Sequence, residues 1–88
     1  MLTHSDFLYA VESELARARS LFGPFHTAHE GYAVILEEVD ELWEMVKQKQ
    51  AHRSPSKMMK ELVQIAAMCE RMAEDLGLMN CDEGKGVR

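Results

Sequence analysis

Residues 35–46 read ILEEVDELWEMV and combine an apolar pattern with an acidic one. The apolar residues recur every three or four positions, which is the spacing of one face of an α-helix. Glu38 and Glu41 are three positions apart, so the same helix carries both carboxylates on one side, one turn apart. Further along, Glu61 and Gln64 repeat this spacing inside a second segment of helical period. The sequence therefore predicts two helices, each with a pair of oxygen-bearing side chains.

Start and stop signals bound this helix and predict another before it. The first helix is predicted to run from Ser5, as its N-cap, to Phe22. Gly23-Pro24 ends it, because glycine supplies a left-handed cap and proline blocks continuation. The helix with the acidic pair covers residues 27–50. Gly31 either permits a close helix crossing within it or marks its true start, and the sequence leaves both open.

A third helix follows the connection of residues 51–54. Ser54 or Ser56 caps it, Pro55 suits its first turn, and Gly77 closes it. Because the connection is short, the second and third helices are expected to be antiparallel neighbours. We therefore predict an all-α helical bundle in which an antiparallel helix pair carries the acidic site.

Apolar stripes on the three helices define the predicted core. They are Leu8, Val11, Leu15, Ala18 and Phe22; then Ala28, Tyr32, Ile35, Leu36, Val39, Leu42, Trp43 and Val46; and then Met58, Leu62, Ile65, Ala66, Cys69, Met72, Ala73 and Leu76. Tyr32 and Trp43 are interpreted as packing residues in preference to base-stacking ones.

Length and composition place further bounds. Eighty-eight residues form one small domain, which buries only roughly 60–65% of its unfolded surface and gains from a shared core. Seven methionines exceed what three short helices can bury, which favours a subunit interface in a homodimer or tetramer. The helical domain is predicted for residues 1–78, with a flexible polar tail at 79–88.

Charge and hydropathy exclude several classes of partner. A net charge of −5 argues against sequence-independent nucleic-acid binding, which needs basic surface. No apolar run approaches the ~18 residues of a membrane span, and no signal pattern opens the chain. Cys69 and Cys81 lack metal-ligand or redox spacing and are interpreted as free thiols in a cytoplasmic protein.

The two acidic pairs border the apolar seam of their helices, and an antiparallel pairing brings them to comparable heights. Converging carboxylates repel one another and resist loss of water unless a cation joins them. Mg²⁺ or Mn²⁺ is the usual partner of such oxygen ligands. The competing interpretation is a solvated acidic face, since glutamate at this spacing is common on exposed helices.

Together the motifs resemble those of the MazG-like all-α nucleoside triphosphate pyrophosphatase superfamily, which is marked by ExxE, a spacer and ExxD. The counterparts here are Glu38-x-x-Glu41 and Glu61-x-x-Gln64, separated by residues 42–60. The context EEVDEL and the preceding HEGYA are similar to small phage and bacterial members. The resemblance covers residues 26–77.

The resemblance implies a Mg²⁺-dependent pyrophosphohydrolase that cleaves a ribo- or deoxynucleoside triphosphate into its monophosphate and pyrophosphate, often as housecleaning of the nucleotide pool. It also implies subunits that associate through helical bundles. Glu38, Glu41 and Glu61 would be metal ligands, with Gln64 a weaker, uncharged fourth where the family has Asp. Glu37 or Glu41 would orient or deprotonate the attacking water, and the sequence does not say which.

Other polar residues have two interpretations each. Lys57 and Lys60 either contact the substrate phosphates or are solvated charges, and Arg53 leaves the same choice open. His26 and His29 have a spacing that suits a metal pair, but a capping or surface role is favoured at a helix start.

Two other functions compete with the enzyme. A non-catalytic helical interaction module would keep the fold with a weakened metal site, and Gln64 is its best support. A carboxylate-bridged di-iron bundle should carry Glu-x-x-His on its helices, and neither acidic helix has one.

Overall fold

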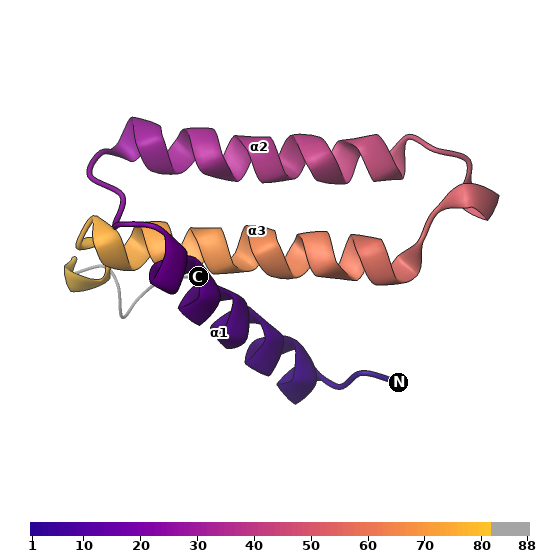
Figure 1. Cartoon of the computed structure of the whole chain (residues 1–88), viewed down its shortest axis with the longest axis horizontal. Helices are drawn as coiled ribbons and strands as arrows, with labels where there is room; N and C mark the ends of the chain where they lie inside the picture. Colours follow the sequence, from indigo (N-terminus) through magenta and orange to yellow (C-terminus); the bar gives the residue numbers. More distant parts are fainter. Residues whose placement is uncertain (82–88) are drawn as a thin grey trace.

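The computed structural model describes residues 1–81, and this part of the chain is built from three long helices (Figure 1). They are α1 (His4–Leu21), α2 (Ala28–Val46) and α3 (Pro55–Asp75), with short 3₁₀ turns η1 (Gln50–His52) and η2 (Leu78–Asn80). None of the described residues is in a β-strand. The all-α prediction is confirmed.

Local capping explains where the helices begin. Thr3, and not the predicted Ser5, caps α1, and it forms a capping box because Asp6 bonds back to its backbone N–H. Thr27 caps α2 through the N–H of Glu30. Ser54 caps α3, with Pro55 in the first turn as predicted.

The helix ends agree less well with the sequence. Gly77 has φ +70° and closes α3 as predicted, but Gly23 is not left-handed, because Phe22 leaves α1 in an extended conformation. The second helix ends at Val46 and not at residue 50. Arg53 explains the early stop, since its guanidinium donates to the carbonyl oxygens of Val46 and Gln48. Arg53 thus satisfies the end of α2.

Helix α3 is the centre of the arrangement. Helices α2 and α3 lie side by side and antiparallel, as predicted, and α1 crosses α3 obliquely (Figure 1). Gly31 lies inside α2 where it meets α3, and a Cβ there would come within 2.8 Å of Met72 Sδ. Gly31 therefore permits a close helix crossing, which resolves the choice left by the sequence.

The core is small and lies mainly between α1 and α3. Its buried apolar residues are Val11, Leu15, Ala18, Phe25, Val63, Ala67 and Met68. Two charged residues of α3, Glu61 and Arg71, are buried with them.

The apolar stripe predicted as the core of α2 is largely exposed, which corrects the sequence interpretation. Tyr32 and Trp43 are 62% and 56% exposed, and Leu36 and Val39 are 41% exposed each. On α3, Leu62 and Cys69 from the predicted stripe are also exposed. The single chain buries other faces of these helices, because α1 packs against α3 along Val63, Ala67 and Met68.

Asp75 ties the end of α3 to α1 and to the connection that follows it. Arg19 donates to Asp75 Oδ1 at 2.8 Å, and the Phe25 N–H donates to Asp75 Oδ2 at 2.9 Å. Burial alone would raise the pKa of Asp75, but the hydrogen bonds from Phe25 and Arg19 lower it overall. This network fixes residues 22–26, which form one wall of the pocket described below.

The domain boundary predicted after residue 78 falls within η2, and residues 82–88 of the predicted tail lie outside the described part of the chain. Within residues 1–81, no helix has the length and apolar character required to cross a membrane.

Candidate metal centre

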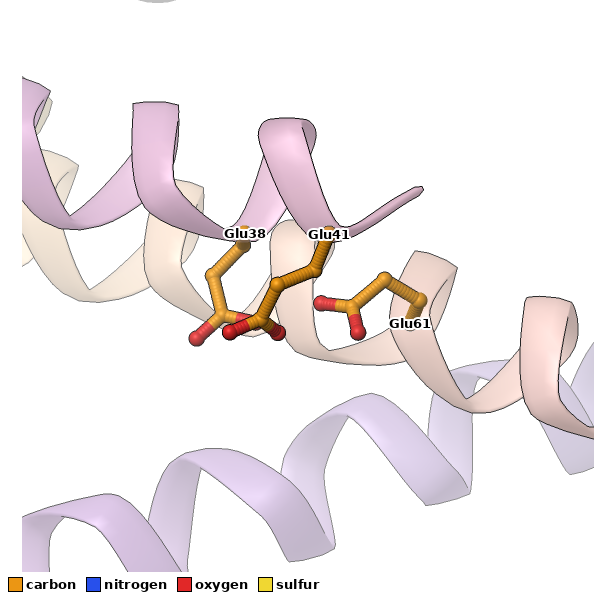
Figure 2. Close-up of side chains that lie close together, drawn as sticks. All are labelled: Glu38, Glu41 and Glu61. Carbon is orange, nitrogen blue, oxygen red and sulfur yellow. The ribbon is translucent and has the colours of Figure 1, made fainter. Parts of the chain in front are cut away.

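Three carboxylates from two helices meet at one point. Glu38 and Glu41 project from the same side of α2, and Glu61 projects toward them from α3 (Figure 2). One oxygen of each lies within 4.8 Å of the other two. Oxygens that bind Mg²⁺ at about 2.0–2.1 Å lie up to about 4.2 Å apart, so small side-chain movements would close this group around a cation.

The group is electrostatically unfavourable without a cation. Glu61 is only 5% exposed, Glu38 is half-buried and Glu41 is exposed. Burial, followed by the hydrogen bond and charge of Glu38 and the charge of Glu41, raises the pKa of Glu61 to about 8. In the described part of the chain, none of the three forms an ion pair with a basic side chain. The donor set therefore fits a hard divalent cation, which would supply the missing positive charge.

Gln64 lies beside the group, one turn after Glu61. Its amide fits best with the nitrogen toward the carboxylates, where it donates to Glu38 Oε2 at 3.2 Å and to Glu61 Oε2 at 3.3 Å. This arrangement suits the carboxylates alone. A cation would attract the amide oxygen instead, so Gln64 would have to turn its amide over to become a ligand.

The other predicted site residues are placed differently. Glu37 is outside the group of three, but it lines a pocket that also reaches Glu38. Lys57 and Lys60 are exposed near the start of α3, and neither lines this pocket. His26 and His29 are both exposed, and among the described residues the acidic group alone has the arrangement of a metal site.

The pocket has a volume of about 530 Å³ and lies between α1, α2, α3 and residues 22–26. Glu37, Glu38 and Gln64 line one part of it, so the pocket reaches the acidic group at Glu38. It also contains two cationic side chains, Arg17 and Arg71. This size is typical of a small-molecule site, and the mixture of charges suits a ligand with anionic and polar parts.

Arg71 lines the same pocket and holds residues 22–26 against α3. Its Nη2 donates to the Gly23 carbonyl oxygen at 2.6 Å, and its guanidinium lies 4.0 Å from the centre of the Phe25 ring. The Phe22 ring is further away, at 5.9 Å. A buried cation that stacks on an aromatic ring and binds a loop carbonyl holds that loop in place.

Arg17 stands on the α1 side of the pocket. It is half exposed and pairs with Glu14 at 2.6 Å, and the Glu14 hydrogen bond and charge are the main reason that its pKa is raised. The charge of Glu38 acts in the same direction with smaller effect, so Arg17 lies within electrostatic reach of the acidic group.

Sequence reasoning missed Arg17, Phe22 and Arg71 as site residues. For Arg71 a signal exists, since the series 61, 64, 68, 71 and 75 is spaced by three and four and therefore shares one face of α3. This series, which is polar except for Met68, borders the apolar stripe that was interpreted as the core. For Arg17 and Phe22 the sequence offers no signal, because only the crossing of α1 over α3 brings them to the site.

Comparisons with protein-family models, with curated proteins and with solved structures find no match to this chain.

Proposed function

We propose that this protein is a Mg²⁺-dependent, or Mn²⁺-dependent, nucleoside triphosphate pyrophosphohydrolase. The observation that carries the proposal is the meeting of Glu38, Glu41 and Glu61 at the edge of a nucleotide-sized pocket that also holds arginine side chains. A triphosphate is strongly anionic, so an acidic pocket binds it only with a bridging cation. The likeness of the two motifs to the MazG-like pyrophosphatases supports the same reaction.

Each residue has a distinct part in this proposal. Glu38, Glu41 and Glu61 hold the cation, and Gln64 contributes an uncharged oxygen after its amide turns. The cation, when bound, neutralises phosphate oxygens, stabilises the leaving pyrophosphate and acidifies an attacking water. Because Glu37 lines the pocket but is outside the group of three, we assign to it the orientation and deprotonation of that water.

The reaction is attack of water at the α-phosphorus, with cleavage of its bond to the bridging oxygen of the β-phosphate. The products are a nucleoside monophosphate and pyrophosphate. Arg17, on the α1 side of the pocket, is placed to attract the departing phosphates.

Pyrophosphate release from a panel of ribo- and deoxynucleoside triphosphates tests the proposal. We expect release with Mg²⁺ or Mn²⁺, none with a chelator, and a loss of roughly 100-fold or more in Glu38→Ala and Glu41→Ala, because each variant removes a metal ligand. Activity that persists in both variants would show that another site or a contaminant is responsible. No release from any nucleotide, with no rise in melting temperature on adding metal, would favour the non-catalytic helical interaction module.

Self-association is the second part of the proposal. Tyr32, Leu36, Val39 and Trp43 are spaced by four, three and four, so they form one continuous exposed stripe along α2. None of them lines the pocket, so a second copy could cover the stripe without closing the site. We propose a homodimer or tetramer built on this face. Two free cysteines support a reducing, cytoplasmic setting.

A further inference from the structure

We infer that the pocket selects guanine nucleotides and that Glu30 reads the base. The inference rests on the proposed function for the orientation of the nucleotide. It goes further by naming the substrate and the residue that chooses it.

The pocket has two chemically different ends. Glu37, Glu38 and Gln64 line it beside the metal centre, and Arg17 lies within electrostatic reach of Glu38. Glu30 lines it eight residues earlier on α2, which places it about 12 Å from Glu38 along the helix axis. That distance is similar to the length of a nucleotide from its base to its first phosphates. Phosphates at the metal centre therefore bring the base to Glu30.

The pocket also offers an aromatic surface. Phe22 is 59% exposed although it is a large apolar side chain, and it lines the pocket where α1 ends. Phe25 is only 4% exposed and packs under Arg71, so it supports the wall and is not available for stacking. An exposed ring in a polar pocket suits stacking against a flat base.

The carboxylate of Glu30 determines which base edge fits. Its Oε1 already accepts the backbone N–H of His26 at 2.7 Å, which holds the side chain at this end. A carboxylate only accepts hydrogen bonds, so it favours an edge with adjacent donors. Guanine alone presents two neighbouring donors on its Watson–Crick edge, N1–H and the N2 amino group. Uracil and thymine place one N–H between two carbonyl oxygens, which a carboxylate repels.

His26 adds a complementary group. It also lines the pocket, next to Glu30, and a ring N–H of histidine can donate to the O6 oxygen of guanine. Adenine has an amino group at that position and offers no acceptor there. His26 therefore offers a donor to O6 of guanine, and the neighbouring Glu30 carboxylate offers acceptors to N1–H and the N2 amino group.

Binding of nucleoside monophosphates in the presence of Mg²⁺ tests the inference separately from catalysis, because a monophosphate has no phosphoanhydride bond to cleave. We expect calorimetry to show that GMP binds roughly tenfold or more tightly than AMP, CMP or UMP, since a good bidentate contact discriminates by this order. Glu30→Gln should lose the preference for GMP and improve binding of AMP. Its amide oxygen can still accept the His26 N–H, so the fold is retained. Glu44→Gln, on the exposed part of α2 outside the pocket, should behave as the unmodified protein.

Equal binding of the four monophosphates, no binding of GMP at millimolar concentration, or a preference that survives in Glu30→Gln would each overturn the inference. Hydrolysis of every triphosphate at one rate would contradict guanine selection and leave the pyrophosphohydrolase intact. Preferential binding of GMP without pyrophosphate release from any triphosphate would support guanine selection and contradict the pyrophosphohydrolase activity.

Discussion

Glu61 is the residue on which the electrostatics of the site depend. It is buried on α3 and faces two further carboxylates from α2. Burial and these neighbours raise its pKa to about 8 from an ordinary value of 4.5. At neutral pH it therefore keeps a proton in the folded protein without metal, and it would release that proton when a cation binds.

This pKa predicts how stability changes with pH. Between pH 4.5 and about 8 the folded state holds a proton on Glu61 that the unfolded state has lost. Without metal, the free energy of unfolding should therefore fall as pH rises through this window, by at most about 1.4 kcal/mol per pH unit. Urea unfolding at several pH values measures the slope, and Mg²⁺ should restore stability most strongly at the alkaline end.

Glu61→Gln is the control for this measurement. Burial and the hydrogen bond with Glu12 also raise the pKa of Glu70, which acts in the same direction. The difference between the two proteins isolates Glu61, and the variant should show a smaller slope and little response to Mg²⁺. Identical slopes would contradict the raised pKa of Glu61.

A second prediction for a single residue concerns the effect of Gln64 on metal affinity. Replacing Gln64 by Asp adds a charged oxygen at a position where the amide, in its better-fitting orientation, donates to Glu38 and Glu61. We expect Gln64→Asp to bind Mg²⁺ roughly tenfold more tightly in calorimetry, because affinity for hard cations rises with ligand charge. The exposed Gln50→Asp serves as control. Weaker binding in Gln64→Asp would mean that the amide is required as a hydrogen-bond donor.

At the scale of the helices, local signals were the most predictive. Caps at Ser54 and Gly77 were found from the sequence because each acts within a few residues of its own position. The end of α2 was not found, because it depends on the side chain of Arg53 returning from the next turn. The buried face of α1 was predicted at Val11, Leu15 and Ala18. The buried face of α3 was not, because it includes the charged residues Glu61 and Arg71 and the sequence pattern assigned only apolar residues to the core.

The candidate site was likewise predicted only in part from the sequence. The acids of α2 and α3 were predicted because their spacing fixes the side of each helix on which they lie. The wall formed by Phe22 and Arg71 was not, because α1 and α3 are far apart in sequence and only packing joins them. Spacing within a helix, and the pairing of α2 with α3 across a short connection, can be predicted from the sequence, whereas the packing of α1 against the distant α3 cannot.

The close packing of α2 against α3 at Gly31 leads to a prediction about stability. Gly31→Ala would place its Cβ within 2.8 Å of Met72 Sδ and 2.9 Å of Met72 Cγ. The gain of roughly 1 kcal/mol in helix propensity should be exceeded by the cost of separating α2 from α3, for a net loss of about 1–2 kcal/mol. Chemical denaturation measures it. Gly23→Ala meets nothing within 4 Å and has no left-handed φ, so it should be nearly neutral. An unchanged or higher stability in Gly31→Ala would contradict a tight crossing.

For the whole molecule, the distribution of apolar surface is the main observation. Within residues 1–81, seven buried apolar residues make up the core, while Tyr32, Leu36, Val39 and Trp43 of α2 are exposed. A domain of this size gains substantially by burying such a stripe against another copy. In our proposal, the periodic apolar residues of α2 form an interface between subunits. This explains why they are not part of the core of a single chain.

Replacing apolar residues of this α2 stripe by glutamate tests the proposal of self-association. Leu36→Glu and Trp43→Glu should convert a dimer or tetramer to a monomer that keeps its helical circular dichroism, because each places a carboxylate in an apolar interface. Light scattering measures the mass. Tyr9→Glu alters a side chain that is 76% exposed on α1 and should leave the mass unchanged. A monomeric unmodified protein would contradict self-association.

The central claim is that Glu38, Glu41 and Glu61 hold one divalent cation together. Anomalous diffraction from crystals grown with Mn²⁺ tests it most directly. We expect a peak between the three carboxylates, about 2.0–2.3 Å from an oxygen of each, and no peak at this position in Glu61→Gln. Mn²⁺ bound elsewhere, or a peak that remains unchanged in the variant, would contradict it.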